Sequence, residues 1–121
     1  YVESCGGRRR HFNIPPKWRS DYKKELAHAQ RQAVNFHCQS VNANAIKRAM
    51  IEFQEVIDQR WPDLVHILLN VHDEIVFMAR LDVLDVALET LAEIMVKTGS
   101  EAIGYTCPVE VSVARAAHWR K

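Results

Sequence analysis

Cysteine is scarce in this sequence, and its three copies lie far apart. Cys5, Cys38 and Cys107 form no Cys-x-x-Cys pair, so the sequence indicates neither a disulfide framework nor a zinc knuckle. Long apolar runs are also missing: no stretch approaches the roughly 20 residues that cross a bilayer, and no charged-then-apolar leader opens the chain. We therefore expect a protein of a reducing compartment, without a membrane span or a secretion signal.

The composition is ordinary for a folded chain. Of 121 residues, 48% are hydrophobic and 26% are charged, which excludes intrinsic disorder for most of the chain and fits one domain with one core. The chain begins at Tyr1 in a strand-like Tyr-Val-Glu sequence without an initiator methionine, so we expect a fragment or processed subunit of something longer. The sequence contains no internal repeat and no low-complexity segment.

Positive charge is concentrated in the first quarter of the chain. Residues 1–31 contain eight Lys or Arg and three Asp or Glu, a net charge of +5, whereas the remainder contains eight against twelve, a net charge of −4. Such a cluster either binds phosphate backbones through counterion release or forms a solvated surface. The basic residues are Arg8, Arg9, Arg10, Lys17, Arg19, Lys23, Lys24 and Arg31.

Turn residues and apolar spacing predict the elements of the first half of the chain. Two glycines and a Pro-Pro pair exclude helix over much of residues 1–20, which we predict to be a basic hairpin and connector. Apolar residues at helical spacing predict a helix pair over residues 21–60, with a first helix over 22–36 and a second over about 39–60. The second helix is expected to end at the Trp-Pro pair that follows it.

The second half of the chain alternates β-prone and helical patterns. Two β-prone runs within residues 64–79 are separated by a short polar stretch, which predicts an antiparallel hairpin. Asp82 is a candidate N-cap for a helix over 82–98, with Gly99 as its C-terminal cap, and alternating valines predict a terminal strand over 108–114. This order implies an α+β fold, in which a small antiparallel sheet packs against three helices.

The polar stretch between the two β-prone runs is His72, Asp73 and Glu74. Adjacent carboxylates among apolar neighbours repel each other, and a divalent cation removes that cost. Oxygen ligands suit Mg²⁺, which keeps several waters and takes one or two protein carboxylates together with substrate phosphates. A plain solvated turn has the same pattern, so the spacing by itself leaves the metal role open.

The string Leu-Asn-Val-His-Asp-Glu-Ile-Val-Phe over residues 69–77 resembles the motif C hairpin of family A DNA polymerases, the DNA polymerase I group. Two further segments are similar to that family in the same order. Residues 1–10 resemble its Tyr-Val-Glu-Thr-x-x-Gly-Arg-Arg segment, and residues 31–51 resemble its Arg-x-Ala-x-Asn-x-Pro-x-Gln-Gly helix pair. Together the three blocks cover essentially the whole chain.

The resemblance implies a polymerase palm segment that takes part in nucleotidyl transfer from deoxynucleoside triphosphates to a DNA primer-template. It implies that Asp73 binds the catalytic Mg²⁺ of a two-metal site, with Glu74 as a secondary acid beside it. It also implies contacts to primer and template, chiefly in the minor groove and on the backbone. The residues at those positions are Arg31, Asn35, Gln39 and His72, to which the charge pattern adds Arg8, Arg9 and Arg10.

The sequence departs from the family pattern in two ways. His37 and Ser40 replace the Pro and Gly of the helix pair, which indicates a divergent branch, cellular or viral. The chain also has no strand with a first palm carboxylate and no fingers helix to grip the incoming nucleotide. We therefore expect the rest of the polymerase, as another chain or a missing N-terminal part, to be a partner. The 121 residues are expected to be inactive alone. We expect the protein in the cytoplasm, at the bacterial nucleoid or in a virus-infected cell.

Two other functions are weighed against a polymerase role. One is a non-catalytic nucleic-acid-binding or assembly module that keeps the fold and the basic end. The other is a hydrolase metal site built from His66, His72, Asp73 and Glu74. The second is disfavoured, because His66 and His72 are six positions apart along one strand and too distant to share one ion.

Overall fold

The computed structural model describes residues 1–4 and 6–118. These residues form two helices and two small antiparallel sheets, an α+β composition as predicted. Where the composition predicted one domain, the chain divides into two compact units, Tyr1–Asn42 and Ala43–Lys121.

The first unit opens with a two-stranded antiparallel ribbon of β1 (Val2–Glu3) and β2 (Arg9–Arg10). Buried Ser4 closes this ribbon, because its N–H donates to the carbonyl oxygen of Arg8 at 2.8 Å and its hydroxyl accepts from the N–H of Arg8 at 3.2 Å. Gly7 has a φ of 74°, a conformation that glycine adopts at little cost. The predicted hairpin at the start of the chain is confirmed.

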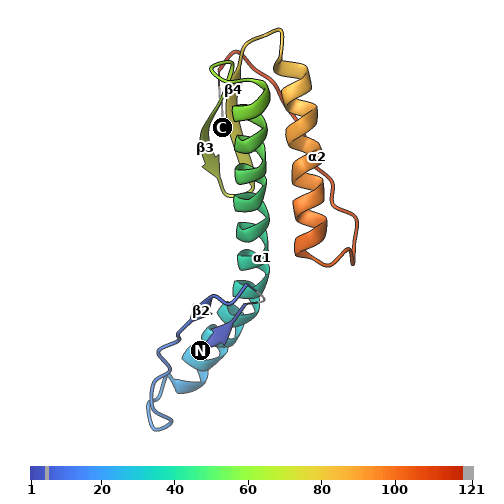
Figure 1. The fold of residues 1–121 in the computed structure, drawn as a ribbon. Helices are drawn as coiled ribbons and strands as arrows, with labels where there is room; N and C mark the ends of the chain where they lie inside the picture. Colours follow the sequence, from blue (N-terminus) through green and yellow to red (C-terminus); the bar gives the residue numbers. More distant parts are fainter. Residues whose placement is uncertain (5, 119–121) are drawn as a thin grey trace. The chain divides into compact units, whose positions relative to one another are not determined.

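One uninterrupted helix, α1 (Tyr22–Arg60), occupies the region for which a helix pair was predicted (Figure 1). The pair was wrong: residues 22–60 contain no Pro or Gly, so nothing breaks the helix between the two apolar runs. Ser40 is buried, and its hydroxyl donates to the carbonyl oxygens of Phe36 at 2.7 Å and His37 at 3.0 Å. Its polar group is therefore satisfied within the helix, which ends just before the Trp-Pro pair as predicted.

The second unit contains the hydrophobic core. After α1, the chain forms β3 (Val65–Val71), β4 (Glu74–Ala79) and α2 (Leu84–Ala102). Fully buried Phe53 of α1 meets Phe77 of β4 edge to face, with ring centroids 5.3 Å apart and an interplanar angle of 72°. The contact anchors the hairpin on α1. The buried cluster is Phe53, Ile57, Trp61, Val65, Ala87 and Leu91.

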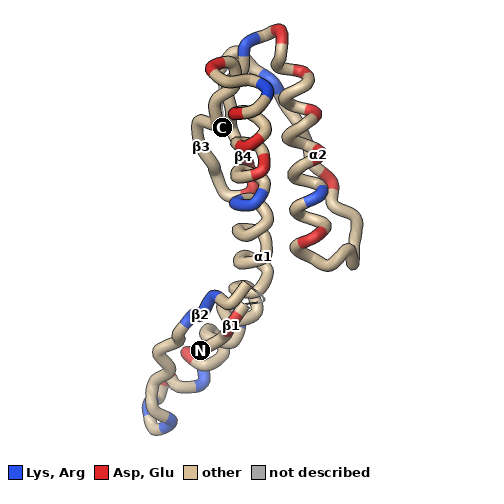
Figure 2. Tube along the Cα trace, viewed as in Figure 1, with Lys and Arg blue, Asp and Glu red and all other residues tan. Residues whose placement is uncertain are grey.

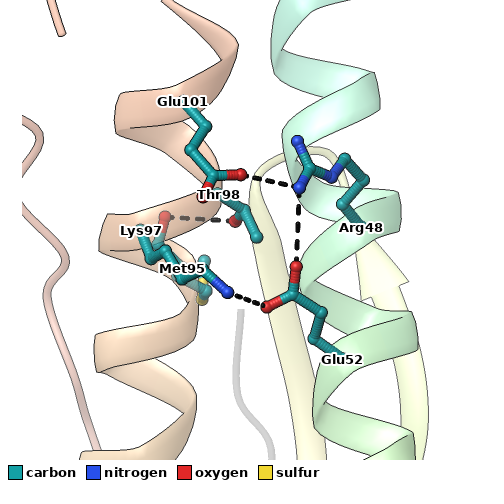
Figure 3. Close-up of polar contacts among 6 residues, drawn as sticks. All are labelled: Arg48, Glu52, Met95, Lys97, Thr98 and Glu101. Atoms are coloured by element: carbon teal, nitrogen blue, oxygen red, sulfur yellow. Dashed lines mark hydrogen bonds and ion pairs between the residues drawn. The ribbon is translucent and has the colours of Figure 1, made fainter.

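Charged side chains join α1 to α2 at the surface of the second unit (Figure 3). Arg48 of α1 contacts Glu101 of α2 at 2.6 Å, and Lys97 of α2 contacts Glu52 of α1 at 3.0 Å. The hydrogen bond from Lys97 to Glu52 is the main cause of a raised pKa of Lys97. Both pairs are largely solvated, so they add little stability, but they favour one register between the helices. The sequence analysis did not predict them.

The start of α2 differs from the prediction. Asp82 does not cap the helix: Val83 occupies the N-cap position, and α2 has no side-chain cap there. The Asp82 carboxylate instead accepts two hydrogen bonds from the Arg80 guanidinium, each 2.6 Å long. This pairing is the main cause of a lowered pKa of Asp82. Arg80 therefore occupies the oxygens that a cap would have offered to the helix.

The end of α2 also differs, because the helix continues through Gly99 to Ala102. The capping glycine is Gly104, which has a φ of 63°. Its N–H donates to the carbonyl oxygen of Glu101 at 3.2 Å, and the N–H of Tyr105 donates to that of Ser100 at 2.9 Å. These two bonds form a Schellman cap. Neither α1 nor α2 carries an apolar stretch long enough for a bilayer span.

The segment after α2 is not the strand that was predicted for residues 108–114. Within the described residues it pairs with no other strand, so the alternating valines lack the partner that a sheet requires. The segment instead returns along α2 (Figure 1). Val109 lies so close to Gly99 that a Cβ on the glycine would meet its Cγ1 at 3.0 Å, and Arg115 pairs with Asp85 near the start of the helix.

Candidate functional site

The acidic turn lies at the loop end of the β3–β4 hairpin. The strands are antiparallel and their last pair is Val71 opposite Glu74, so His72 and Asp73 form a two-residue loop. Glu74 is the first residue of β4. The predicted hairpin is confirmed, and its loop contains two of the three predicted turn residues, because Glu74 belongs to β4.

A β-bulge interrupts the hairpin between this loop and the core. Ile67 pairs with Phe77 and Leu69 pairs with Val76, so Leu68 has no partner residue on β4. Because strand side chains alternate between faces, one extra residue reverses which β3 side chains face the core beyond this point. Leu69 consequently lies on the outer face and is 38% exposed.

The bulge places Asn70 opposite Ile75, on the face that packs against the core cluster. The Asn70 side-chain amide donates to the carbonyl oxygen of Glu74 at 3.1 Å and, in a longer contact of 3.5 Å, to that of His72. These two carbonyls lie on either side of Asp73 in the chain. The sequence analysis did not assign Asn70 to the site. In the sequence, the feature that could have pointed to Asn70 is a side-chain amide within the otherwise apolar run of residues 67–71.

The loop backbone takes an uncommon conformation at His72, which has a φ of 56°. Two-residue hairpin loops require positive φ, which is usually supplied by glycine or asparagine. Histidine is among the few other residues enriched in this region. The conformation costs of order 1 kcal/mol or more, and such strain often marks functional sites.

The carboxylates of Asp73 and Glu74 are exposed, and their oxygens are the hard donors that Mg²⁺ prefers. Within residues 1–4 and 6–118, no group of three or more His, Cys, Asp or Glu residues is placed to hold a metal ion. His66 lies at the other end of β3 from His72, so the hydrolase site does not form. The turn fits an ion that takes much of its shell from water and substrate phosphates, and it cannot hold two ions by itself.

In the first unit, α1 presents Arg31, Asn35 and Gln39 at intervals of four residues. This spacing places them on one face of the helix, and all three are exposed. The shared face depended on an unbroken helix, which the structure provides. A shallow groove lies on this part of α1 and is lined by Gln30, Arg31, Val34, Asn35 and Cys38.

The three arginines of the first hairpin differ in their surroundings, although Figure 2 shows them as one basic stretch at β2. Arg9 donates to Glu3 at 2.7 Å, and its guanidinium lies 5.1 Å from the ring centroid of Tyr1. Arg10 lies 5.6 Å from the ring centroid of Phe12. Arg8 is exposed and forms no ion pair within the described part of the chain. Its charge is therefore the least compensated of the three.

The predicted site residues fall into two groups, one in each unit. The three arginines and the polar row on α1 lie in Tyr1–Asn42, and residues 72–74 lie in Ala43–Lys121. Within the first group, Arg31, Asn35 and Gln39 share one face of α1. Within the second group, two carboxylates and a histidine lie at one end of the hairpin.

Comparison with known proteins identifies the family to which the chain is similar. The family model "DNA polymerase family A" matches residues 1–121. The chain is 30% identical over 120 residues to DNA polymerase I of Rhizobium leguminosarum and 34% identical over 121 residues to DNA polymerase I of Treponema pallidum (strain Nichols). It is 31% identical over 119 residues to a thermostable DNA polymerase I of Thermus filiformis. No solved structure matches the chain.

The chain therefore belongs to DNA polymerase family A. Each of these alignments covers 98% of the chain but a small share of the relative: 12% in Rhizobium leguminosarum, 11% in Treponema pallidum and 13% in Thermus filiformis. The chain thus spans about an eighth of the length of the relatives that it matches.

Proposed function

We propose that this chain is the C-terminal palm segment of a template-directed DNA polymerase, which adds deoxynucleotides to a DNA primer. The observation that carries the proposal is the position of Asp73. It occupies a two-residue loop at the end of a hairpin whose other end is anchored in the core, in a chain that belongs to DNA polymerase family A. The acidic turn also matches the motif C string of that family.

In this proposal, Asp73 holds the catalytic Mg²⁺. When bound, the paired ions of such a site activate the primer 3′-hydroxyl and stabilise the leaving pyrophosphate. The contribution of the chain itself is to hold one carboxylate at a fixed point, and two paired strands on a packed core provide that. Glu74 starts β4 and has the secondary role, since successive strand residues face opposite ways.

Contacts to DNA come from both groups of residues. The amides of Asn35 and Gln39 and the imidazole of His72 donate to purine N3 and pyrimidine O2 acceptors in the minor groove, which every base pair offers. Such donors test the shape of a pair without reading its sequence. Arg31 and the three arginines of the first hairpin contact phosphates, which position the duplex.

The other partners are the incoming deoxynucleoside triphosphate and the rest of the polymerase. The remaining metal ligands and the residues that grip the triphosphate lie outside these 121 residues, so the chain alone does not polymerise. A role in DNA replication and repair places the protein with the genome, in the bacterial nucleoid or in a virus-infected cell.

Substitution of Asp73 in the polymerase that contains this chain tests the proposal. Asp73→Asn keeps size and polarity but removes the charge that holds Mg²⁺. Because metal stabilisation of the transition state is worth several kcal/mol, we expect single-nucleotide extension at saturating Mg²⁺ to fall about 100-fold or more, with primer-template affinity retained. Glu74→Gln is expected to be milder.

Asp63→Asn is the matched control, because Asp63 is also exposed, lies just before the other end of the hairpin and has a positive φ that Asn tolerates. It should extend primers like the wild type. Near-normal extension by Asp73→Asn would contradict the catalytic assignment, and retained DNA binding in that case would favour the non-catalytic binding module.

A further inference from the structure

We propose that Asn70 is a positioning residue for Asp73: its side-chain amide fixes the backbone on both sides of the metal-binding carboxylate. The inference rests on the proposed function of Asp73. It adds a residue whose effect is transmitted through the main chain, without contact with substrate or metal.

The first argument is the placement of the hydrogen bonds. The Asn70 amide donates to the carbonyl oxygen of Glu74 at 3.1 Å and to that of His72 at 3.5 Å. Asp73 lies between these two residues in the chain, so one side chain restrains the peptide unit just before Asp73 and the peptide unit that follows Glu74. The shorter bond is the stronger restraint, and the longer one is at the limit of a hydrogen bond.

The second argument is that the Asp73 side chain has no other support. Within the described residues it forms no hydrogen bond and no ion pair. It is exposed in a loop without glycine, next to His72 with its positive φ. Since no described residue holds the carboxylate directly, its position depends on the loop backbone, to which the Asn70 side chain bonds.

The third argument is the β-bulge at Leu68. Without the extra residue, position 70 would lie on the opposite face of β3 from the one that it now shares with Ile75. The bulge therefore selects the face from which the Asn70 amide reaches the loop carbonyls. Bulges near functional sites commonly re-aim a side chain in this way.

Asn70→Leu in the polymerase that contains this chain tests the inference, because leucine has a similar shape, no charge and no donor. We expect hydrogen exchange in peptides covering residues 71–75 of the metal-free protein to accelerate about three- to tenfold, the change produced by loss of one exposed hydrogen bond. We expect the Mg²⁺ concentration for half-maximal extension to rise by a similar factor, with primer-template affinity unchanged. Asn70→Gln keeps the amide and should recover most of both losses.

His66→Leu is the matched control, since His66 is an exposed residue on the same strand, far from the loop. It should leave exchange at the loop and the Mg²⁺ requirement unchanged. Wild-type exchange and Mg²⁺ requirement in Asn70→Leu would overturn the inference, even if Asp73→Asn abolishes extension. Faster exchange over the whole hairpin with a lowered melting temperature would also overturn it, because the role would then be structural. Normal extension by Asp73→Asn would contradict the proposed function. Hydrogen exchange in Asn70→Leu would still decide whether Asn70 holds the loop.

Discussion

Truncation of Phe53 is the perturbation that should most disturb the support of the hairpin. Phe53 is fully buried and meets Phe77 of β4 edge to face at 5.3 Å. Burial of a phenylalanine contributes about 1.5–3 kcal/mol, and an aromatic pair adds about 0.5–1.5 kcal/mol. With the cavity that remains, we expect Phe53→Ala to lower the free energy of unfolding by about 3–5 kcal/mol. This is a large fraction of the roughly 5–15 kcal/mol that holds a domain folded.

Urea unfolding of the 121-residue chain, followed by far-ultraviolet circular dichroism, measures this change. Ile51→Ala is the matched control, because Ile51 is on the same helix two residues away and is 61% exposed; its effect should stay within about 0.5 kcal/mol. A double-mutant cycle with Phe77→Ala should return a coupling of about 0.5–1.5 kcal/mol. Equal effects of Phe53→Ala and Ile51→Ala would refute the assignment of the core.

Three further predictions concern other parts of the chain. Gly99→Ala normally stabilises a helix interior by about 1 kcal/mol, but here the added methyl meets Val109 at 3.0 Å; we expect the gain in melting temperature only when Val109→Ala is also present, and a gain in the single variant would contradict the close contact. The raised pKa of Lys97 means that its stabilising contribution is complete below its ordinary pKa of 10.5 and is lost as pH rises through the raised value; urea midpoints of wild type and Lys97→Met should therefore converge at high pH, and a constant difference would count against the ion pair. Arg8→Ala should make the salt dependence of DNA binding shallower by about 0.9 in log-log slope, and Arg9→Ala by less because of its carboxylate partner; unchanged slopes would refute phosphate contacts.

The β3–β4 hairpin could be predicted from the sequence because its signals are local. Alternation of apolar residues sets each strand, and the polar turn between them fixes the pairing. The bulge at Leu68 was not predictable in the same way, since the side chain of an extra residue differs in no respect from that of a paired one. The proposed role of Asn70 depends on that bulge, so it could be inferred only once the register of the two strands was known.

The helices show where sequence signals compete. The helix pair was predicted from two separate runs of apolar residues at helical spacing, over 22–36 and about 39–60. No Pro or Gly lies between these runs, so α1 continues through His37 and Ser40. At the end of α2, Gly99 was the predicted cap, but the helix continues to Ala102 and Gly104 caps it. Close packing against Val109 accounts for a glycine at position 99 inside the helix. Asp82 does not cap α2, because its carboxylate accepts hydrogen bonds from Arg80, two residues earlier in the chain.

The most direct test of the central claim is the location of the metal ion. In the polymerase that contains this chain, bound to primer-template and incoming nucleotide, Fe²⁺ can replace Mg²⁺ and, with peroxide, generate hydroxyl radicals that cut the backbone near the ion. Our proposal predicts a cut within residues 71–75 that disappears in Asp73→Asn and remains in Asp63→Asn. A protein without a cut in this hairpin, or with a cut that Asp73→Asn leaves unchanged, would contradict the assignment of Asp73 as a metal ligand.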